Sequence, residues 1–124
     1  MIEEISVKDL GTIKEKYQII DIRDEIDFRY GSIPGAVNIP QKEIKDAAKE
    51  FDRDTFYIIM CKSGVVSDGV AEELREVGLR AVNLKEGYYG FMFENLNSDR
   101  QKAADVEKKA RAVTMSYGQL TKPS

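Results

Sequence analysis

Ile58-Ile-Met-Cys61-Lys-Ser-Gly-Val-Val-Ser67 is the stretch from which the fold can be predicted, because an apolar run leads directly into a short loop that opens a helix. The run begins at Phe56 and is nearly continuous in its apolar character, with aromatic and β-branched residues. This pattern is typical of a strand buried on both faces, as in a parallel sheet. A run of the same kind, Tyr17-Gln-Ile-Ile-Asp-Ile22, predicts a second buried strand.

Shorter apolar segments complete the predicted sheet. They are Ile5-Ser-Val7, Ala36-Val-Asn-Ile39 and Ala81-Val-Asn-Leu84. The last two each begin just after a glycine-containing turn or break, which often marks the start of a strand. The segment at Ile5 is expected to add an edge strand.

Two connections between the strands have apolar residues at helical spacing. The first carries Ile44, Ala47, Ala48 and Phe51, and the second carries Val70, Leu74 and Val77. This spacing predicts amphipathic helices. The second helix is expected to end at Gly78, and Ser67 and Asp68 are expected to cap its start. Strands that alternate with helices predict an α/β domain with a central parallel sheet flanked by helices.

The composition of the chain changes near residue 97. Ser98 to Arg111 is charged and contains alanines, with Ser98 and Gln101 placed as a capping box, and the segment from Thr114 onward has no clear period. We therefore expect a domain over residues 1–97, followed by a charged helical extension and tail over residues 98–124.

Composition excludes several classes of function. The 124 residues are 42% hydrophobic and 33% charged, with a net charge of -3, a balance typical of a globular domain. A basic face for nucleic acid or acidic membranes is not expected. Met1 to Lys14 lacks the uninterrupted apolar core of a signal peptide, so a cytoplasmic location is the expectation.

The counts of cysteine and histidine limit the chemistry further. One cysteine allows no internal disulfide and no C-x-x-C redox pair. The absence of histidine removes Ser-His-Asp and Cys-His catalysis and the commonest metal ligand. We expect neither a metal nor a cofactor, and a nucleophile in this chain must be activated by other groups.

Cys61 is the candidate nucleophile. It stands where a predicted strand ends and a helix-opening loop begins, which is where ligands bind in open α/β sheets. A free cysteine with a pKa near 8.5 is only about 3% thiolate at pH 7, but inward-facing loop amides, a helix N-terminus and Lys62 can all stabilise the thiolate. The alternative is a small buried apolar residue that ends a strand. Gly64 favours the anion-binding loop.

Three motifs, which follow the order and spacing of the family along the chain, resemble the rhodanese family. Cys61-Lys-Ser-Gly-Val-Val-Ser67 is similar to its active-site loop, C-[RK]-x-G-x-[RT]-[SA]. Asp21-Ile-Arg23, Asp27-Phe28 and Gly31-Ser-Ile-Pro-Gly-Ala-Val-Asn-Ile-Pro40 are similar to D-[VI]-R…[ED]-[FY]-x-x-G-H-I-x-G-A-x-[NH]-[IL]-P. Leu84-Lys-Glu-Gly-Tyr88, with Phe91, is similar to L-x-G-G-x-x-x-W, and the motifs together span about Ile5 to Leu96.

The resemblance implies a rhodanese-like domain, which has a central parallel sheet with helices on both faces. It also implies that Cys61 takes sulfur from a donor such as thiosulfate and carries it as a persulfide. A thiol, cyanide or a protein would accept the sulfur. The loop residues implied to cradle the sulfur are Lys62, Ser63, Gly64, Val65, Val66 and Ser67. The implied supporting residues are Asp21, Arg23 and Asp27, and the alternative, as their main role, is an ion-pair cluster that fixes the loop after the first long strand.

Several positions depart from the family pattern. Ser32 stands where histidine is common, Glu86 replaces a glycine and Phe91 replaces a tryptophan, and we interpret these positions as structural. Val66 occupies a position where arginine or threonine is common, so one polar contact to the donor is missing. Lys62 could attract an anionic donor or be a solvated charge on the loop rim, and Ser63 could contact a sulfonyl oxygen or only complete the turn.

Two other functions compete with sulfur transfer. A phosphatase of related fold would also use a cysteine in an anion-binding loop, but it would carry arginine at the position of Ser67 to hold the phosphoryl group. A catalytically silent module that binds a partner or regulates is the second rival, and Val66 and the charged tail leave it open. The retained Cys61 favours the enzyme.

Overall fold

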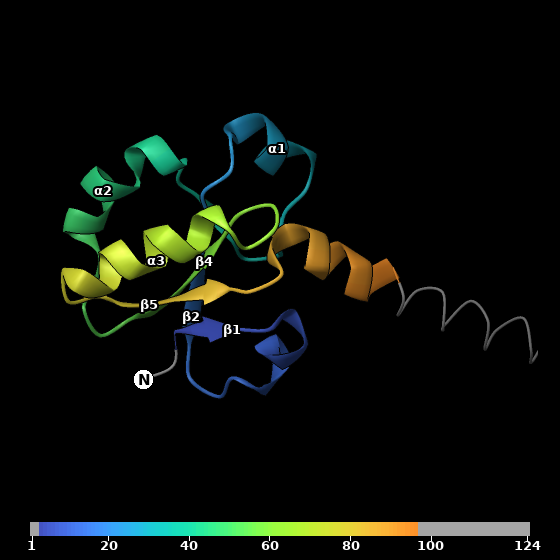
Figure 1. The fold of residues 1–124 in the computed structure, drawn as a ribbon, viewed down its shortest axis with the longest axis horizontal. Coiled ribbons are helices and arrows are strands. Elements are labelled where there is room, and N and C mark those ends of the chain that lie inside the picture. The colour runs from blue at the N-terminus through green and yellow to red at the C-terminus, as the bar shows by residue number, and fades with distance from the viewer. Residues whose placement is uncertain (1–2, 97–124) are drawn as a thin grey trace, which may run out of the picture. The chain divides into compact units, whose positions relative to one another are not determined.

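The computed structural model describes residues 3–96 of the chain (Figure 1). The chain divides into two units between residues 92 and 93, and the sheet and the candidate site belong to the first. The predicted domain boundary at residue 97 and the predicted helical extension and tail over 98–124 lie outside the described residues.

A five-stranded parallel sheet forms the centre of the first unit, which confirms the predicted α/β fold class. The strand order is β1-β5-β4-β2-β3, with every neighbouring pair parallel. The strands are β1 (Glu4–Ile5), β2 (Tyr17–Asp21), β3 (Val37–Asn38), β4 (Phe56–Met60) and β5 (Arg80–Leu84). An edge strand forms at Ile5, as expected, but it spans Glu4–Ile5, and Val7 begins a 3-10 helix instead. The strand that leads to Cys61 lies in the middle.

Both faces of β4 are buried, as its continuous apolar run predicts. Ile58 and Ile59 are each 0% exposed. Because successive side chains of a strand point to opposite faces, the two residues belong to two different apolar clusters. Ile58 pairs in register with Ile19 of β2 and Val82 of β5, so its cluster continues across the sheet.

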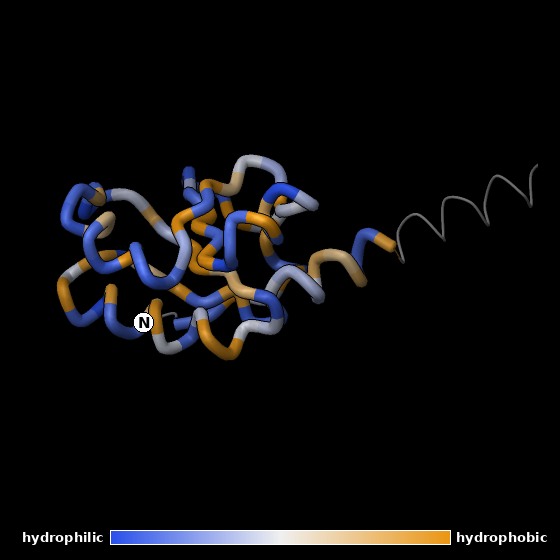
Figure 2. The backbone as a smooth tube through the Cα atoms, turned by 90° about the horizontal axis from the view of Figure 1, so that it is seen from above, coloured by the Kyte–Doolittle hydropathy of each residue, from blue (hydrophilic) through white to orange (hydrophobic). Residues whose placement is uncertain are grey.

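Helices cover both faces, as the family resemblance implies. On one face α2 (Ile44–Ala47) and α3 (Val66–Glu76) pack through Ile44, Val70 and Leu74, and Figure 1 shows both helices on the same side of β4 and β5. On the other face the 3-10 helix η1 (Val7–Thr12) and the helix that begins at residue 87 contribute Val7, Tyr88 and Phe91. Apolar stretches run through the middle of this unit in Figure 2.

The helices differ from the prediction at several points. The predicted helix around Ile44 is a single α-helical turn flanked by the 3-10 helices η2 (Gln41–Glu43) and η3 (Ala48–Glu50). The helix α3 ends before Gly78, as predicted. Its predicted cap was wrong: Val65 is the N-cap residue and no side chain caps it, because the Ser67 hydroxyl faces buried polar partners in the sheet.

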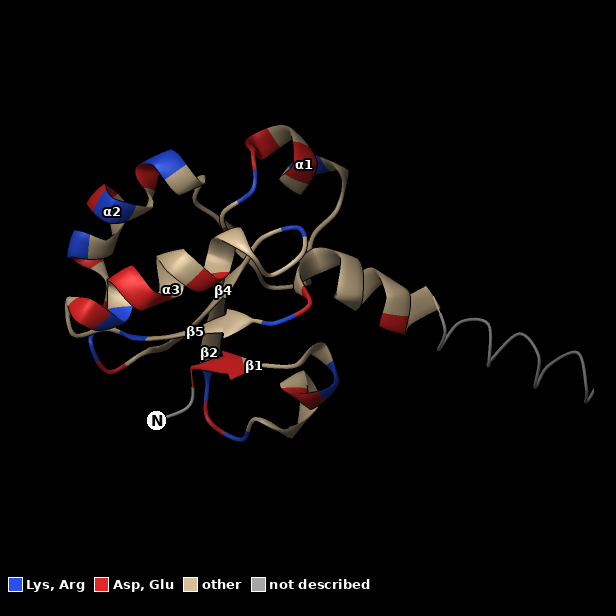
Figure 3. Cartoon of the chain, viewed as in Figure 1, with Lys and Arg blue, Asp and Glu red and all other residues tan. Residues whose placement is uncertain are grey.

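The helix α1 (Glu25–Tyr30) was not predicted and buries none of its side chains. Figure 3 shows charges of both signs interspersed along α1, α2 and α3, which is typical of solvated helix faces. None of the helices in residues 3–96 has the length and apolar character that a bilayer crossing requires.

Candidate active site

The Cys61 sulfur lies where hydrogen-bond donors of the loop converge. Cys61 directly follows β4 and is 6% exposed. Its Sγ accepts hydrogen bonds from the amide of Gly64 at 3.2 Å and from the amide of Ser67 at 3.3 Å. The Ser67 Oγ is 3.1 Å away. Since the first amides of a helix have no partner within the helix, α3 offers one of them to the sulfur.

Gly64 permits the tight turn of this loop. Its φ of +87° lies in the region that favours glycine, and a β-carbon there would overlap the carbonyl of Lys85. The segment after β5 also holds the loop from outside. The amide of Tyr88 donates to the Cys61 carbonyl at 2.8 Å, and the amide of Tyr89 donates to the Lys62 carbonyl at 3.0 Å. The loop is thus fixed on two sides by backbone.

The electrostatic surroundings of Cys61 favour the thiolate. Burial alone raises the pKa of the thiol. When Cys61 is ionised, hydrogen bonds from the Ser67 hydroxyl and from the amides of Ser67, Ser63 and Gly64 act in the opposite direction, because they stabilise the negative sulfur. The hydrogen bonds outweigh burial, so the pKa of Cys61 lies below its ordinary value. This direction agrees with activation of a cysteine without histidine.

We expect the alkylation rate of the folded protein to rise with pH at a midpoint below about 8.5, the ordinary value for cysteine. The same chain unfolded in denaturant is the matched control. Because the folded pKa is depressed, the thiolate stabilises the folded state above the unfolded pKa, and this contribution is lost as pH falls through the folded pKa. A folded midpoint at or above the unfolded one would contradict the role assigned to the loop amides.

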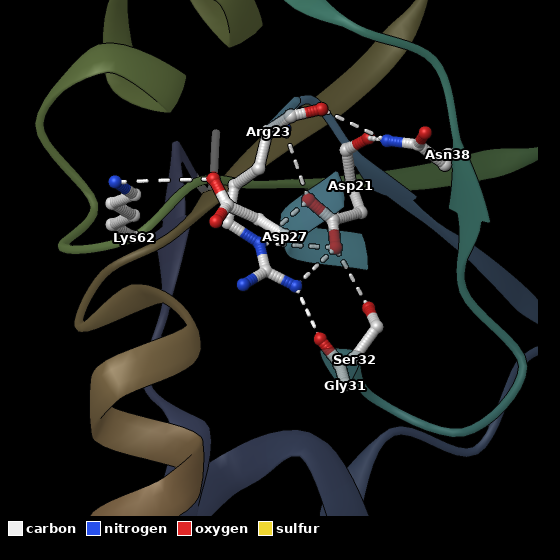
Figure 4. Close-up of polar contacts among 7 residues, drawn as sticks. All are labelled: Asp21, Arg23, Asp27, Gly31, Ser32, Asn38 and Lys62. Atoms are coloured by element: carbon white, nitrogen blue, oxygen red, sulfur yellow. Dashed lines mark hydrogen bonds and ion pairs between the residues drawn. The ribbon is translucent and has the colours of Figure 1, made fainter. Parts of the chain in front are cut away.

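A second polar cluster surrounds the end of β2 (Figure 4). The carboxylate of Asp21 is 0% exposed and accepts hydrogen bonds from the Arg23 amide, from Arg23 Nε and, at 2.7 Å, from Arg23 Nη2. It also accepts from the Ser32 hydroxyl at 2.8 Å, and Arg23 Nη2 donates to the Gly31 carbonyl at 2.6 Å. Asp21 and Arg23 therefore form a buried pair that ties the chain after β2 to the turn at Gly31.

This cluster reaches the cysteine loop through Tyr88. The guanidinium carbon of Arg23 lies 4.1 Å from the centre of the Tyr88 ring, a favourable cation–π position. The Tyr88 amide in turn donates to the Cys61 carbonyl. Arg23 thus reaches the cysteine loop through Tyr88, and the hydrogen bonds at the Cys61 sulfur come from Gly64 and Ser67.

Asp27 and Lys62 meet at the rim of the loop. Lys62 Nζ lies 3.9 Å from Asp27 Oδ2, with the two side chains 57% and 35% exposed (Figure 4). The contact joins α1 to the loop. Ser63 is exposed, and Val65 and Val66 present apolar side chains that are 74% and 47% exposed.

Asn83 is the site residue that the sequence analysis missed. Its side chain is 2% exposed. It accepts a hydrogen bond from the Ser67 hydroxyl and donates from Nδ2 to the Gly64 carbonyl at 2.8 Å. The available signal was an amide inside a buried apolar strand, since such a group needs internal partners.

The positions that depart from the family pattern have structural contacts. Ser32 holds Asp21, and Glu86 accepts hydrogen bonds from the Ser6 hydroxyl and the Val7 amide, both at 2.8 Å. Phe91 packs in the apolar cluster with Tyr88. These contacts confirm the structural interpretation of Ser32, Glu86 and Phe91.

Two other parts of the described chain do not add to the site. A cavity of 1090 Å³ opens beside η1 and the start of β5, and none of residues 61–67 lines it. Residues 3–96 contain no group of three or more His, Cys, Asp or Glu side chains placed to hold a metal ion. Neither feature therefore adds a residue to the candidate site at Cys61.

A parallel sheet that delivers a cysteine into an amide-lined loop before a helix is the arrangement that the resemblance to the rhodanese family implies. The sequence matches the family described as "Rhodanese-like domain" over residues 6–94, and the chain belongs to this family.

Relatives of the chain include proteins named as sulfurtransferases. The chain is 34% identical over 91 residues to the putative sulfurtransferase YtwF of Bacillus subtilis, covering 67% of this chain and 88% of the relative. It is 30% identical over 94 residues to the thiosulfate sulfurtransferase GlpE of Shewanella oneidensis, covering 74% and 93%. A crystal structure of a rhodanese-related protein from Thermoplasma volcanium superposes with a TM-score of 0.70 at 29% identity, covering 74% and 92%.

Proposed function

We propose that the chain is a sulfurtransferase that moves sulfane sulfur from a donor such as thiosulfate to a thiol or to cyanide through a persulfide on Cys61. The observation that carries the proposal is the convergence of the Gly64 and Ser67 amides on the Cys61 sulfur. These donors stabilise a thiolate and, after transfer, the negative charge of a persulfide. The names of the relatives support the same reaction class.

The proposed reaction has two displacement steps. The Cys61 thiolate attacks the outer sulfur of thiosulfate, a new sulfur–sulfur bond forms, and the old one breaks with its electron pair leaving on sulfite. The acceptor thiolate or cyanide then attacks the outer sulfur of the persulfide and releases the Cys61 thiolate. Amides from Lys62 to Ser67 are the proposed cradle for the transferred sulfur. Asp21 and Arg23 are proposed to hold this cradle in place, whereas Asp27 pairs with Lys62 at its rim.

Mass spectrometry of the protein after incubation with thiosulfate tests the function directly. We expect a mass gain of one sulfur atom in the wild type and none in Cys61→Ser. Because the chain contains a single cysteine, the loaded protein has no internal thiol to discharge it. The added sulfur is therefore expected to persist after the donor is removed and to leave when cyanide or a thiol is supplied. Loading that survives in Cys61→Ser would contradict the assignment of Cys61.

A catalytically silent rhodanese-like module is the second candidate. The exposed Val65 and Val66 favour it, because they place apolar groups on the loop where a polar contact to an anionic donor would be expected. Such a module would bind a partner and would show no mass gain with thiosulfate or with a low-molecular-weight persulfide. The same measurement therefore separates the two functions.

Lys62 and Asp27 provide a test of how an anionic donor is recruited. We expect Lys62→Ala to lower kcat/KM for thiosulfate by about fivefold, which corresponds to ~1 kcal/mol for an exposed charge. Asp27→Asn removes the partner of the ammonium group and is expected to raise the same rate. A donor without net charge should respond to neither substitution. Equal losses for charged and uncharged donors would show that Lys62 has no part in recruitment.

A further inference from the structure

Asn83 connects the two parts of the loop that contact the Cys61 sulfur. Its Nδ2 donates to the Gly64 carbonyl, and its Oδ1 accepts the Ser67 hydroxyl proton. Only the NH₂ end of an amide can donate to a carbonyl, so Gly64 determines which way the Asn83 amide points. Since Ser67 Oγ also lies 3.1 Å from Cys61 Sγ, the thiol, the hydroxyl and the amide form one continuous chain of hydrogen bonds.

The number of protons in this chain differs between the two states of Cys61. In the neutral state the thiol donates to Ser67 Oγ and the Ser67 hydroxyl donates to Asn83 Oδ1, so every group has a partner. When the thiol proton leaves to solvent, the single Ser67 proton faces two acceptors, the sulfur anion and Asn83 Oδ1. A hydroxyl has only one proton to donate, and an acceptor without a donor in a buried site is unfavourable.

We propose that Asn83 is a positioning residue that holds the Ser67 proton away from Cys61, so that the reactive thiolate forms only as this hydroxyl turns from the Asn83 carbonyl to the sulfur. The inference rests on the proposed function in one respect, which is that the thiolate is the reacting form of Cys61. Asn83 thereby opposes the ionisation that the loop amides favour, and it contacts neither donor nor acceptor of sulfur.

Charged groups near the loop do not account for the competition between the Cys61 sulfur and Asn83 Oδ1 for the Ser67 proton. Ionisable side chains on the elements around the loop include Glu4, Asp21, Arg23, Asp27, Tyr57, Lys62, Asp68, Glu72, Glu73, Arg75, Glu76, Arg80, Lys85, Glu86 and Tyr88. Asp21 pairs with Arg23, Asp27 with Lys62, and Glu86 accepts from Ser6 and Val7. The test variants, Asn83→Leu and Ser67→Ala, change no formal charge, so the contributions of these groups are common to all the proteins compared.

The first experiment needs no substitution at Asn83. In the isotope-labelled wild type, the side-chain carbonyl and amide resonances of Asn83 are followed by NMR through the pH range in which Cys61 is alkylated. We expect them to shift with the same midpoint as the alkylation rate, because Oδ1 loses its donor when Cys61 ionises. The Asn38 amide donates to the carbonyls of Asp21 and Arg23 outside this network, and it should not shift.

The second experiment measures the alkylation midpoint of Asn83→Leu with Ser67 intact and in the Ser67→Ala background. Asn83→Leu removes the contact to Gly64 in both backgrounds. Only in the background that keeps Ser67 does it also free the Ser67 hydroxyl proton to donate to the sulfur. We therefore expect the substitution to lower the midpoint by about one pH unit more in the Ser67 protein, the size typical of a hydrogen bond to a charged group.

Each outcome bears on the proposal. Asn83 resonances that do not shift when Cys61 ionises would overturn it. Resonances that shift by the same amount in Ser67→Ala would also overturn it, because such a shift would be a direct effect of the sulfur charge. Equal midpoint shifts in the two backgrounds would also overturn it. If Asn83→Leu does not fold, the NMR titration decides alone. Neither experiment uses a sulfur donor, so absence of sulfur loading would count against the proposed function and not against this network.

Discussion

Replacement of Gly64 by alanine is expected to destabilise the domain and to disable the cysteine loop together. A residue with a β-carbon is disfavoured at the φ of +87°, and its methyl group would overlap the Lys85 carbonyl. Positive φ costs about 1–2 kcal/mol, and movement of the loop away from β5 adds to this. We expect the free energy of unfolding to fall by about 3 kcal/mol, or roughly 12–20 °C in Tm for a domain of this size.

The same substitution should change the chemistry of Cys61. The Gly64 amide donates to the sulfur, so a displaced loop stabilises the thiolate less. The alkylation midpoint is expected to move up toward the ordinary value of about 8.5, and sulfur loading from thiosulfate should slow. Thermal melting, alkylation and mass spectrometry on one preparation measure all three effects.

Gly69→Ala is the matched control for this prediction. Gly69 lies within α3, and apart from the backbone of the helix itself and the two neighbouring residues no atom stands within 4 Å of a β-carbon placed there. Alanine in a helix is favoured over glycine by about 0.5–1 kcal/mol, so this variant should be slightly more stable than the wild type. A Gly64→Ala protein that melts like the wild type would show that the loop is not confined by Lys85.

The second large effect is expected from Asp21→Ala. Asp21 is the buried partner of Arg23, whose side chain is only 6% exposed, and it accepts hydrogen bonds from the Arg23 amide and from Ser32 as well. Its removal leaves a buried guanidinium without its carboxylate, which typically destabilises a protein by about 3–5 kcal/mol. Chemical denaturation of the variant measures this loss.

Two further variants separate the buried charge from other causes. Asp21→Ala combined with Arg23→Leu removes both charges and is expected to recover part of the loss, since no unpaired charge remains. Glu25→Ala breaks an exposed ion pair, in which the side chains of Arg29 and Glu25 are 74% and 65% exposed. It should change the free energy of unfolding by less than about 0.5 kcal/mol. If the double variant were no more stable than Asp21→Ala, the unpaired guanidinium would not be the cause.

The sequence by itself determined the parallel sheet and the place of the cysteine within it. A continuous apolar run such as Phe56 to Met60 indicates a strand buried on both faces, so it identifies a central strand even when the neighbouring strands are unknown. The position of Cys61 at a strand end and the helix end before Gly78 depend equally on short stretches of chain. The helices α1 and η1 have no comparable apolar pattern in the sequence, because they are short and bury few side chains.

Only the tertiary structure decided which polar groups meet at the site. Asn83 and Cys61 are distant in sequence, and they come together because β5 lies beside β4 in the order β1-β5-β4-β2-β3. Because the two strands are neighbours, the Ser67 hydroxyl contacts Cys61 and Asn83 and does not cap the helix as predicted. Asp27 of α1 likewise meets Lys62 of the loop only in the folded chain, because the two residues are far apart in sequence. Apolar periodicity shows that a side chain is buried, but the partner of a buried polar group depends on strand order and loop contacts, which no local pattern specifies.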